Sequence, residues 1–134
     1  AYLAANTIIP IALGENHFGL WQFRDIINHK CGRIIQADPT VMGGFTEYKR
    51  LSGLCAANSL KMAPHCFHDI SIQMGLCIPE VMIMEYMDLA GDVINVQAII
   101  ENPIEAHNGR IRAYDTPGHG LILDRKAVEK YKLQ

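Results

Sequence analysis

The chain has 134 residues, of which 49% are apolar and 19% are charged, a balance typical of one globular domain with its own core. Its formal net charge of −2, without any run of Lys or Arg, argues against binding to nucleic acid or to an anionic membrane surface. No apolar stretch approaches the roughly 18 residues that a membrane-spanning helix needs, and no basic leader precedes the first apolar run, so we expect neither a membrane anchor nor a signal peptide.

The four cysteines are Cys31, Cys55, Cys66 and Cys77, and no two of them form a Cys-x-x-Cys pair. We expect free thiols in a reducing compartment rather than disulfides. Together with the composition, this predicts a soluble protein of the cytoplasm.

Apolar runs and helical patterns alternate from the start of the chain to Glu85. The first run predicts a buried strand within Thr7–Leu13 whose regular part begins at Pro10, because proline is awkward inside a strand. Residues 20–28 then carry apolar side chains at helical spacing, and Gly32 stands where a C-terminal cap is expected.

The alternation continues with three more strands and two more helices. Arg33–Ala37 is short, apolar and β-branched, which predicts the second strand. Thr46 is the expected N-cap of a helix whose apolar residues repeat at the helical period. Beyond this helix the sequence predicts a third strand, another helix and a fourth strand, at Leu60–Ala63, Asp69–Cys77 and Val81–Glu85.

Strands that alternate with helices indicate an α/β fold with a parallel sheet. A residue able to do chemistry follows or ends each predicted strand: Glu15, Asp38, His65 and Glu85. In a parallel α/β barrel the carboxyl ends of all strands face one mouth, where active sites are built. We therefore predict that these four side chains converge at one rim of the sheet.

The alternation stops after Glu85, and the remaining residues predict a β-rich tail with short apolar runs between Gly and Pro. Asn108-Gly109 is a strong turn signal. Asp124 is the expected cap of a short last helix that ends near Tyr131.

A closed barrel needs eight strands and about 250 residues, whereas this sequence predicts four strands. Either the chain is half of a larger protein or it is something other than a closed barrel.

Five segments resemble the C-terminal half of the barrel domain in the mandelate racemase subgroup of the enolase superfamily. They are GEN at 14–16, QADPTVMGGFTEYKR at 36–50, APHCFHDIS at 63–71, MEYMDLAG at 84–91 and GRIRAYDTPGHGL at 109–121. The resemblance implies the C-terminal half of a modified TIM (β/α)7β barrel, with four parallel strands in residues 1–90. It also implies that residues 91–134 are a tail that returns to pack on a missing capping domain.

By this resemblance, the chemistry is a Mg²⁺-assisted removal of the proton next to a carboxylate, with an enediolate intermediate. Glu15 corresponds to the third metal-binding carboxylate, and a carboxylate oxygen suits Mg²⁺. Asp38 and His65 resemble an Asp–His dyad in which His65 moves the proton and Asp38 orients the imidazole. Glu85 resembles the acid that hydrogen-bonds the developing enediolate, for which it must be protonated.

The resemblance favours an acid-sugar dehydratase, with a 2-hydroxy-acid racemase or epimerase as the alternative. Another alternative is a non-catalytic fragment or a half-barrel that assembles with a partner chain. The upstream base and the other two metal carboxylates belong before Ala1, so we expect the chain alone to be inactive and to need the missing N-terminal half. The implied partners are a small 2-hydroxy acid or acid sugar and further copies of the protein in a homo-oligomer.

A different catalytic class, a zinc hydrolase, rests on the His-x-x-His spacing of His65 and His68. His65 falls at a strand end and no third ligand is nearby in the sequence, so this pattern is the weaker hypothesis.

Overall fold

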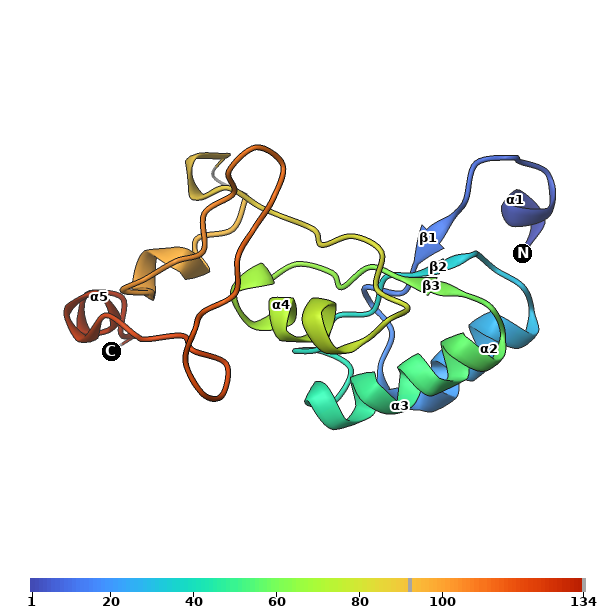
Figure 1. Cartoon of the computed structure of the whole chain (residues 1–134), viewed down its shortest axis with the longest axis horizontal. Helices are drawn as coiled ribbons and strands as arrows, with labels where there is room; N and C mark the ends of the chain where they lie inside the picture. The colour runs from blue at the N-terminus through green and yellow to red at the C-terminus, as the bar shows by residue number, and fades with distance from the viewer. Residues whose placement is uncertain (92, 134) are drawn as a thin grey trace.

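A short parallel sheet organises the first half of the computed structural model, which describes residues 1–91 and 93–133 (Figure 1). Its three strands lie in the order β1-β2-β3 and have the bounds Ala12–Leu13, Ile34–Ile35 and Lys61–Met62. Ala12 pairs with Ile34, and Ile34 pairs in turn with Lys61. The parallel α/β fold is as the sequence predicts.

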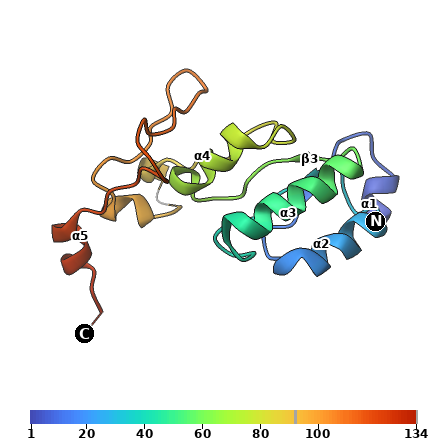
Figure 2. The ribbon, with the colours of Figure 1, turned by 60° about the horizontal axis from the view of Figure 1, so that its bottom comes forward.

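The helices α2 and α3 cross over between these strands and pack on each other, whereas α4 lies between them and the C-terminal tail (Figures 1 and 2). These helices have the bounds Gly19–Asn28 for α2, Gly44–Ala57 for α3 and His68–Cys77 for α4, and a short helix α1 (Tyr2–Ala5) precedes them. Their inward residues form one buried cluster with the sheet, built around Phe23, Ile35, Tyr48, Leu51 and Met62, all 0% exposed. This cluster fixes the ends of the strands relative to one another.

The first predicted strand is wrong in extent, because only Ala12 and Leu13 pair with β2. Ile8 is fully exposed and Ile9 is 68% exposed, so the residues before Pro10 are not a buried strand. Proline has no N–H to donate to a ladder, and the regular part of the strand accordingly begins after it.

The fourth predicted strand, Val81–Glu85, is reduced to one parallel bridge between Met62 and Val81. Met62 donates its N–H to Glu80 at 2.9 Å, and Met82 donates to Met62 at 3.0 Å. The next N–H in this ladder would come from Pro64, two residues after Met62, and proline has no N–H. The sequence pattern located the segment correctly but could not show that its ladder ends after one step.

Two predicted helix caps are also wrong. α2 ends in a Schellman motif in which Lys30, with φ of 51°, takes the left-handed position, and Cys31 donates to Ile26. Gly32 instead lies against β1, where an added Cβ would stand 2.7 Å from the Ile11 carbonyl oxygen. α3 begins at Gly44, whose N–H donates to Pro39, so Thr46 lies inside the first turn rather than capping it.

The tail contains little sheet, contrary to the β-rich prediction. Its elements are two 3-10 helices, η1 (Leu89–Gly91) and η2 (Val96–Ile99), and the helix α5 (Arg125–Lys130). Its described residues form only isolated antiparallel bridges, Ile100 with Leu123 and His107 with Arg110. The Gly and Pro residues between the apolar runs interrupt any longer ladder.

Two local predictions in the tail are confirmed. Asn108 and Gly109 both have positive φ, 52° and 71°, and form the tight turn between His107 and Arg110. The Asp124 side chain accepts hydrogen bonds from the backbone of Lys126 and Ala127 and caps α5. The division into residues 1–90 and 91–134 stays a prediction.

A buried carboxylate fastens the tail to α4. Asp69 is 0% exposed and accepts hydrogen bonds from the Ile104 N–H at 2.7 Å, the Tyr114 hydroxyl at 3.1 Å and the Gln97 amide at 3.0 Å. Burial, together with the Asp69 charge, raises the pKa of the Tyr114 phenol, which therefore stays a hydrogen-bond donor. Within the described ranges, no helix is long and apolar enough to cross a membrane.

Candidate active site

The four polar residues singled out from the sequence lie together at the carboxyl end of the sheet. Glu15 follows β1, Asp38 follows β2, His65 follows β3, and Glu85 follows the segment bridged to Met62. The backbone ladder continues beyond the named strands, because the His65 N–H donates to the Ala37 carbonyl at 3.1 Å. Parallel pairing in register therefore brings strand ends that are far apart in the sequence to one rim.

The turn after β1 depends on Gly14, which has a φ of 133°. An added Cβ at this position would stand 2.8 Å from the Phe23 ring, in the centre of the buried cluster. The His17 N–H donates back to Gly14, which closes a turn over the next residue, Glu15. Glycine thus lets the chain leave the core sharply, and the Glu15 carboxylate emerges at the rim with 51% of its side chain exposed.

Asp38 is rigidly held and nearly buried, with 4% of its surface exposed. Its Oδ1 accepts hydrogen bonds from the Thr40 N–H at 2.7 Å and the Thr40 hydroxyl at 2.6 Å. Its Oδ2 lies 3.2 Å from His65 Nδ1. An imidazole whose Nδ1 proton is donated to a fixed carboxylate keeps its other nitrogen available as an acceptor of protons.

The other ring nitrogen of His65 faces two more carboxylates. Its Nε2 lies 3.3 Å from Glu15 Oε2 and 3.8 Å from Glu85 Oε2. The His65 side chain is 23% exposed and that of Glu85 is 30% exposed, so both are accessible from the rim. The arrangement can accept a proton at Nε2 and stabilise the charge that results.

Glu85 is anchored by the residue that follows His65. Its Oε2 accepts a hydrogen bond from the Cys66 N–H at 2.6 Å. Cys66 has a φ of 52°, a left-handed conformation that is uncommon for a residue with a Cβ. This turn in the backbone brings the Cys66 amide, and with it Glu85, back toward the imidazole.

Sequence reasoning missed two contributors to the site. Thr40 fixes the oxygen of Asp38 that does not face His65, and its signal is the Asp-Pro-Thr order that typically forms such a turn. Cys66 places its sulfur within 4.8 Å of ligand atoms of Asp38 and His65. Burial raises the pKa of its thiol, and the Asp38 and Glu85 charges add to this, whereas a hydrogen bond from the Phe67 backbone lowers it.

The sequence resemblance implies Mg²⁺, and one side chain at the rim, that of Glu15, is a suitable ligand for it. Glu15 offers a hard, accessible carboxylate oxygen at the rim. The group of Asp38, His65 and Cys66 does not suit Mg²⁺, because it combines a thiol and an imidazole with only one carboxylate. Glu15 is therefore a fitting ligand for Mg²⁺ but needs further oxygen ligands beside it.

The zinc hypothesis for His65 and His68 does not fit the structure. His68 is 2% exposed and lies against the tail, where its Nε2 is 2.7 Å from the Gln97 amide nitrogen. Its ring contacts the Tyr86 ring in a tilted arrangement, with the centroids 4.5 Å apart. An Nε2 that accepts the Gln97 N–H is already occupied. His68 is a structural histidine that joins α4 to the tail.

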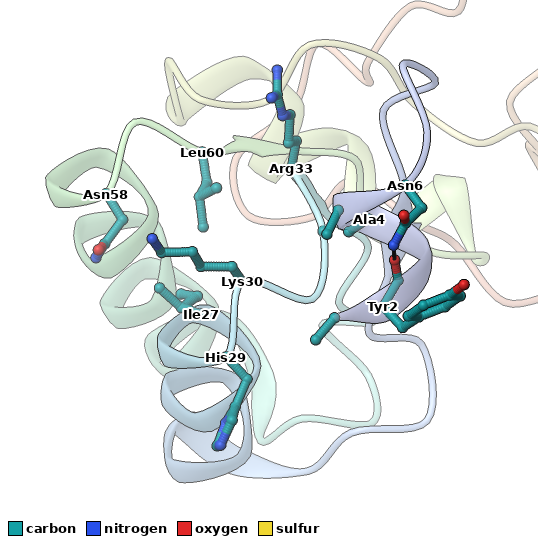
Figure 3. Close-up of a pocket in the computed structure, with 12 residues that line it drawn as sticks. Tyr2, Ala4, Asn6, Ile27, His29, Lys30, Arg33, Asn58 and Leu60 are labelled. Carbon is teal, nitrogen blue, oxygen red and sulfur yellow. Dashed lines mark hydrogen bonds between the residues drawn. The ribbon is translucent and has the colours of Figure 1, made fainter.

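A large cavity lies at the other end of the sheet, and Figure 3 shows the residues that line it. It has a volume of about 720 Å³ and is bordered by α1, by Lys30 and Arg33 before β2, and by Leu60 before β3. Its side chains include no carboxylate, so it lacks a pair of groups for acid–base work. The chemistry of this chain is concentrated at the carboxyl rim instead.

Comparison with known proteins identifies what this chain is similar to. The family described as "enolase C-terminal domain-like" matches residues 1–127. A 3,6-anhydro-α-L-galactonate cycloisomerase of Streptomyces coelicolor is 28% identical over 85% of this chain and 30% of its own length. A D-mannonate dehydratase of Novosphingobium aromaticivorans is 26% identical over 94% of this chain and 32% of its own length. The chain thus spans about a third of the length of these relatives.

Solved structures share the fold closely. An enolase from Bradyrhizobium, solved with magnesium and mandelic acid, superposes with a TM-score of 0.86 and is 28% identical over 98% of this chain and 35% of its own. Other structures with this fold are described as mandelate racemase/muconate lactonizing enzymes. The match confirms the fold expected from the sequence, the C-terminal half of a TIM barrel.

Proposed function

Since the chain belongs to the enolase superfamily, and within it to the mandelate racemase subgroup, we propose that its rim residues take part in removing the proton next to a substrate carboxylate. The full-length protein is the enzyme in this proposal, because the chain spans about a third of the length of its relatives. The observation that carries the proposal is the position of His65, whose Nδ1 is paired with Asp38 while its Nε2 faces the open rim.

His65 exchanges the proton with the α-carbon through Nε2. Asp38 accepts a hydrogen bond from the Nδ1–H of His65, so Nε2 carries the lone pair that receives the substrate proton. The imidazolium that forms lies between carboxylates on both sides, and this stabilises its charge. The buried, twice hydrogen-bonded Asp38 keeps the ring oriented through the reaction.

Glu85 donates a hydrogen bond to the enediolate in its protonated form. An α-proton beside a carboxylate is too weakly acidic for an unaided imidazole, so charge must be stabilised where it develops. The Cys66 N–H holds one Glu85 oxygen 3.8 Å from the imidazole, and this proximity supports the proposed role of Glu85 as a hydrogen-bond donor to the enediolate.

Glu15 is the residue of this chain that would hold Mg²⁺, and the ion would supply Lewis-acid stabilisation of the substrate carboxylate. Glu15 lies 3.3 Å from His65 Nε2, so the same residue also bounds the space where substrate must sit. We propose that upstream residues supply the other metal carboxylates and the second base. The chain alone is then inactive, because one carboxylate cannot hold Mg²⁺ usefully.

We favour dehydration of an acid sugar, with expulsion of a β-hydroxyl after proton removal. The relatives named as D-mannonate dehydratases support this outcome. The second candidate is racemisation or epimerisation of a 2-hydroxy acid, which shares the first step, and the mandelic acid in the Bradyrhizobium structure favours it. A half-barrel that only assembles with a partner chain is the non-catalytic alternative. In that case, substitutions at the rim would not change any catalytic activity.

The test is a screen of the full-length protein, with Mg²⁺, against acid sugars and aryl hydroxy acids. We expect one acid sugar to be converted to a 2-keto-3-deoxy acid, detected as a new carbonyl and by mass loss of one water. Interconversion of epimers without loss of water would identify a racemase instead. No product and no α-proton exchange with any member of the library would contradict the proposed function.

A further inference from the structure

Cys66 belongs to a cluster with Asp38 and His65, and its thiol is the one member that the proposed reaction does not use. Ligand atoms of Asp38, His65 and Cys66 all lie within 4.8 Å of one another, and no other group of three metal-binding side chains this close is found in residues 1–91 and 93–133. The thiol itself has no role in moving the proton. Its position beside the dyad therefore needs another account.

The three donors fit a soft cation better than a hard one. A thiolate and an imidazole with one carboxylate form a donor set that zinc readily takes, whereas Mg²⁺ prefers oxygen alone. A thiolate and a carboxylate carry two negative charges, so a divalent cation would leave this partly buried site neutral.

We propose that Asp38, His65 and Cys66 form a binding site for Zn²⁺, separate from the Mg²⁺ position at Glu15, and that zinc bound there disables the dyad. The binding half of this proposal stands on the geometry alone. The inhibitory half rests on the proposed function, in which His65 is the base.

The hydrogen bonds around the cluster suit a metal ligand set. Zinc-bound histidines usually donate their other ring N–H to a carboxylate, and His65 Nε2 faces Glu15 and Glu85 at 3.3 and 3.8 Å. The Cys66 N–H is itself bonded to Glu85 Oε2 at 2.6 Å, which ties the backbone of this ligand to one of those carboxylates. The ligands and their partners are thus already arranged around the place where the ion would sit.

Binding requires one proton to leave and one to move. The Cys66 thiol loses its proton to solvent on forming the Zn–S bond. The His65 proton shifts from Nδ1, which faces Asp38, to Nε2, which faces Glu15. The ion thereby takes the place of the proton in the dyad, and Nε2 can no longer accept one from substrate.

Only small movements are needed. Tetrahedral zinc with bonds of about 2.0–2.3 Å needs its ligand atoms roughly 3.3–3.7 Å apart. Asp38 Oδ2 and His65 Nδ1 are already 3.2 Å apart. Asp38 is fixed by Thr40, so the adjustment falls to the Cys66 sulfur, which is the end of a short and only partly buried side chain.

The test measures cation binding on the full-length protein saturated with Mg²⁺, so that oxygen sites are filled. Alkylation of single thiols is followed by peptide mass spectrometry, with and without Zn²⁺. We expect Zn²⁺ to slow alkylation of Cys66 at least tenfold and to leave the exposed Cys77 unchanged, which makes Cys77 the internal control. The buried Cys55, whose pKa burial raises to about 12, should not react under either condition.

Titration with Cd²⁺, which gives a thiolate charge-transfer absorption, measures affinity directly. Cys66→Ser should weaken binding about tenfold or more, whereas the matched Cys77→Ser should not. His65→Asn provides a second variant at the site that keeps the thiol and should weaken binding as well. Circular dichroism checks that each variant is folded.

Two outcomes overturn the metal site: equal Cd²⁺ affinity in Cys66→Ser and in the parent, or no protection of Cys66 by Zn²⁺. Both measurements are independent of turnover, so they test the metal site even if the proposed function is wrong. With an active enzyme, zinc inhibition that persists undiminished in Cys66→Ser would show that zinc acts elsewhere and would overturn the inhibitory half.

Discussion

The two ends of the sheet differ in the side chains they bring together, and this difference favours the carboxyl end as the candidate site. The amino end borders a cavity of about 720 Å³ with the exposed cations Lys30 and Arg33 (Figure 3). At the carboxyl end, three carboxylates lie within 3.8 Å of the ring nitrogens of one histidine, His65. Cavity volume alone would favour the amino end, whereas the chemistry of the side chains favours the carboxyl end.

The difference follows from how a parallel sheet is built. Strand ends that point the same way deliver one side chain each to the same rim, so residues distant in sequence meet there. The loops at the other end only return the chain from helix to strand, and the Schellman turn at Lys30 serves that purpose. Substitutions at the two ends should therefore have very different effects on the full-length enzyme.

Glu85→Gln should lower turnover more than a substitution of Asp38 at the same rim. The amide keeps the shape and can still contact the Cys66 N–H, but it is a poorer donor to the enediolate than a carboxylic acid. We expect kcat to fall by roughly 10²–10³-fold with KM nearly unchanged, because the bond strengthens only at the transition state. Steady-state kinetics would show the opposite pattern, a raised KM and an intact kcat, if Glu85 only bound substrate.

Asp38→Asn should have a smaller effect on the rate. The amide keeps its position through Thr40, but it holds the imidazole tautomer less well and does not stabilise the imidazolium. We expect kcat to fall by about 10–100-fold, the range found for carboxylates that orient metal-bound histidines. The pH profile of kcat should shift as well, and a profile identical to that of the parent enzyme would mean that Asp38 has only a structural role.

Arg33→Ala tests the amino end and should have the smallest effect. Arg33 is exposed beside the large cavity and lies at the opposite end of the strands from His65. We expect kcat/KM to change by less than about twofold, since surface substitutions away from a site usually have little effect. A loss comparable with that of Asp38→Asn would contradict the contrast between the two ends.

Much of the fold and the grouping of the candidate site residues at one rim could be predicted from the sequence, because both depend on local order along the chain. Glu15, Asp38, His65 and Glu85 each end an apolar run, and the ends of such runs meet in a parallel sheet. The extent of the strands was not predictable in this way. The segment at Val81 pairs over one residue rather than five because Pro64, just after β3, has no N–H to continue the ladder. The hydrophobic periodicity of the segment itself carries no information about this neighbour.

The tail was the hardest part to predict for a similar physical reason. Its apolar alternation resembles strand, yet its position depends on one buried carboxylate, Asp69, and on partners 28 to 45 residues away. Such long-range polar contacts leave no periodic trace. The turn at Asn108 and the cap at Asp124 were predictable because their partners lie within three residues.

The central claim is that His65, held by Asp38, exchanges the α-proton of the substrate. The direct measurement follows deuterium incorporation at the α-carbon by NMR in D₂O, for both epimers of the acid that the screen identifies, with the parent enzyme and His65→Asn. For the epimer whose proton faces His65, exchange should fall by roughly 10²–10⁴-fold in the variant while Mg²⁺ binding is retained. Exchange of both epimers at the parent rate in folded, Mg²⁺-loaded His65→Asn would contradict the account.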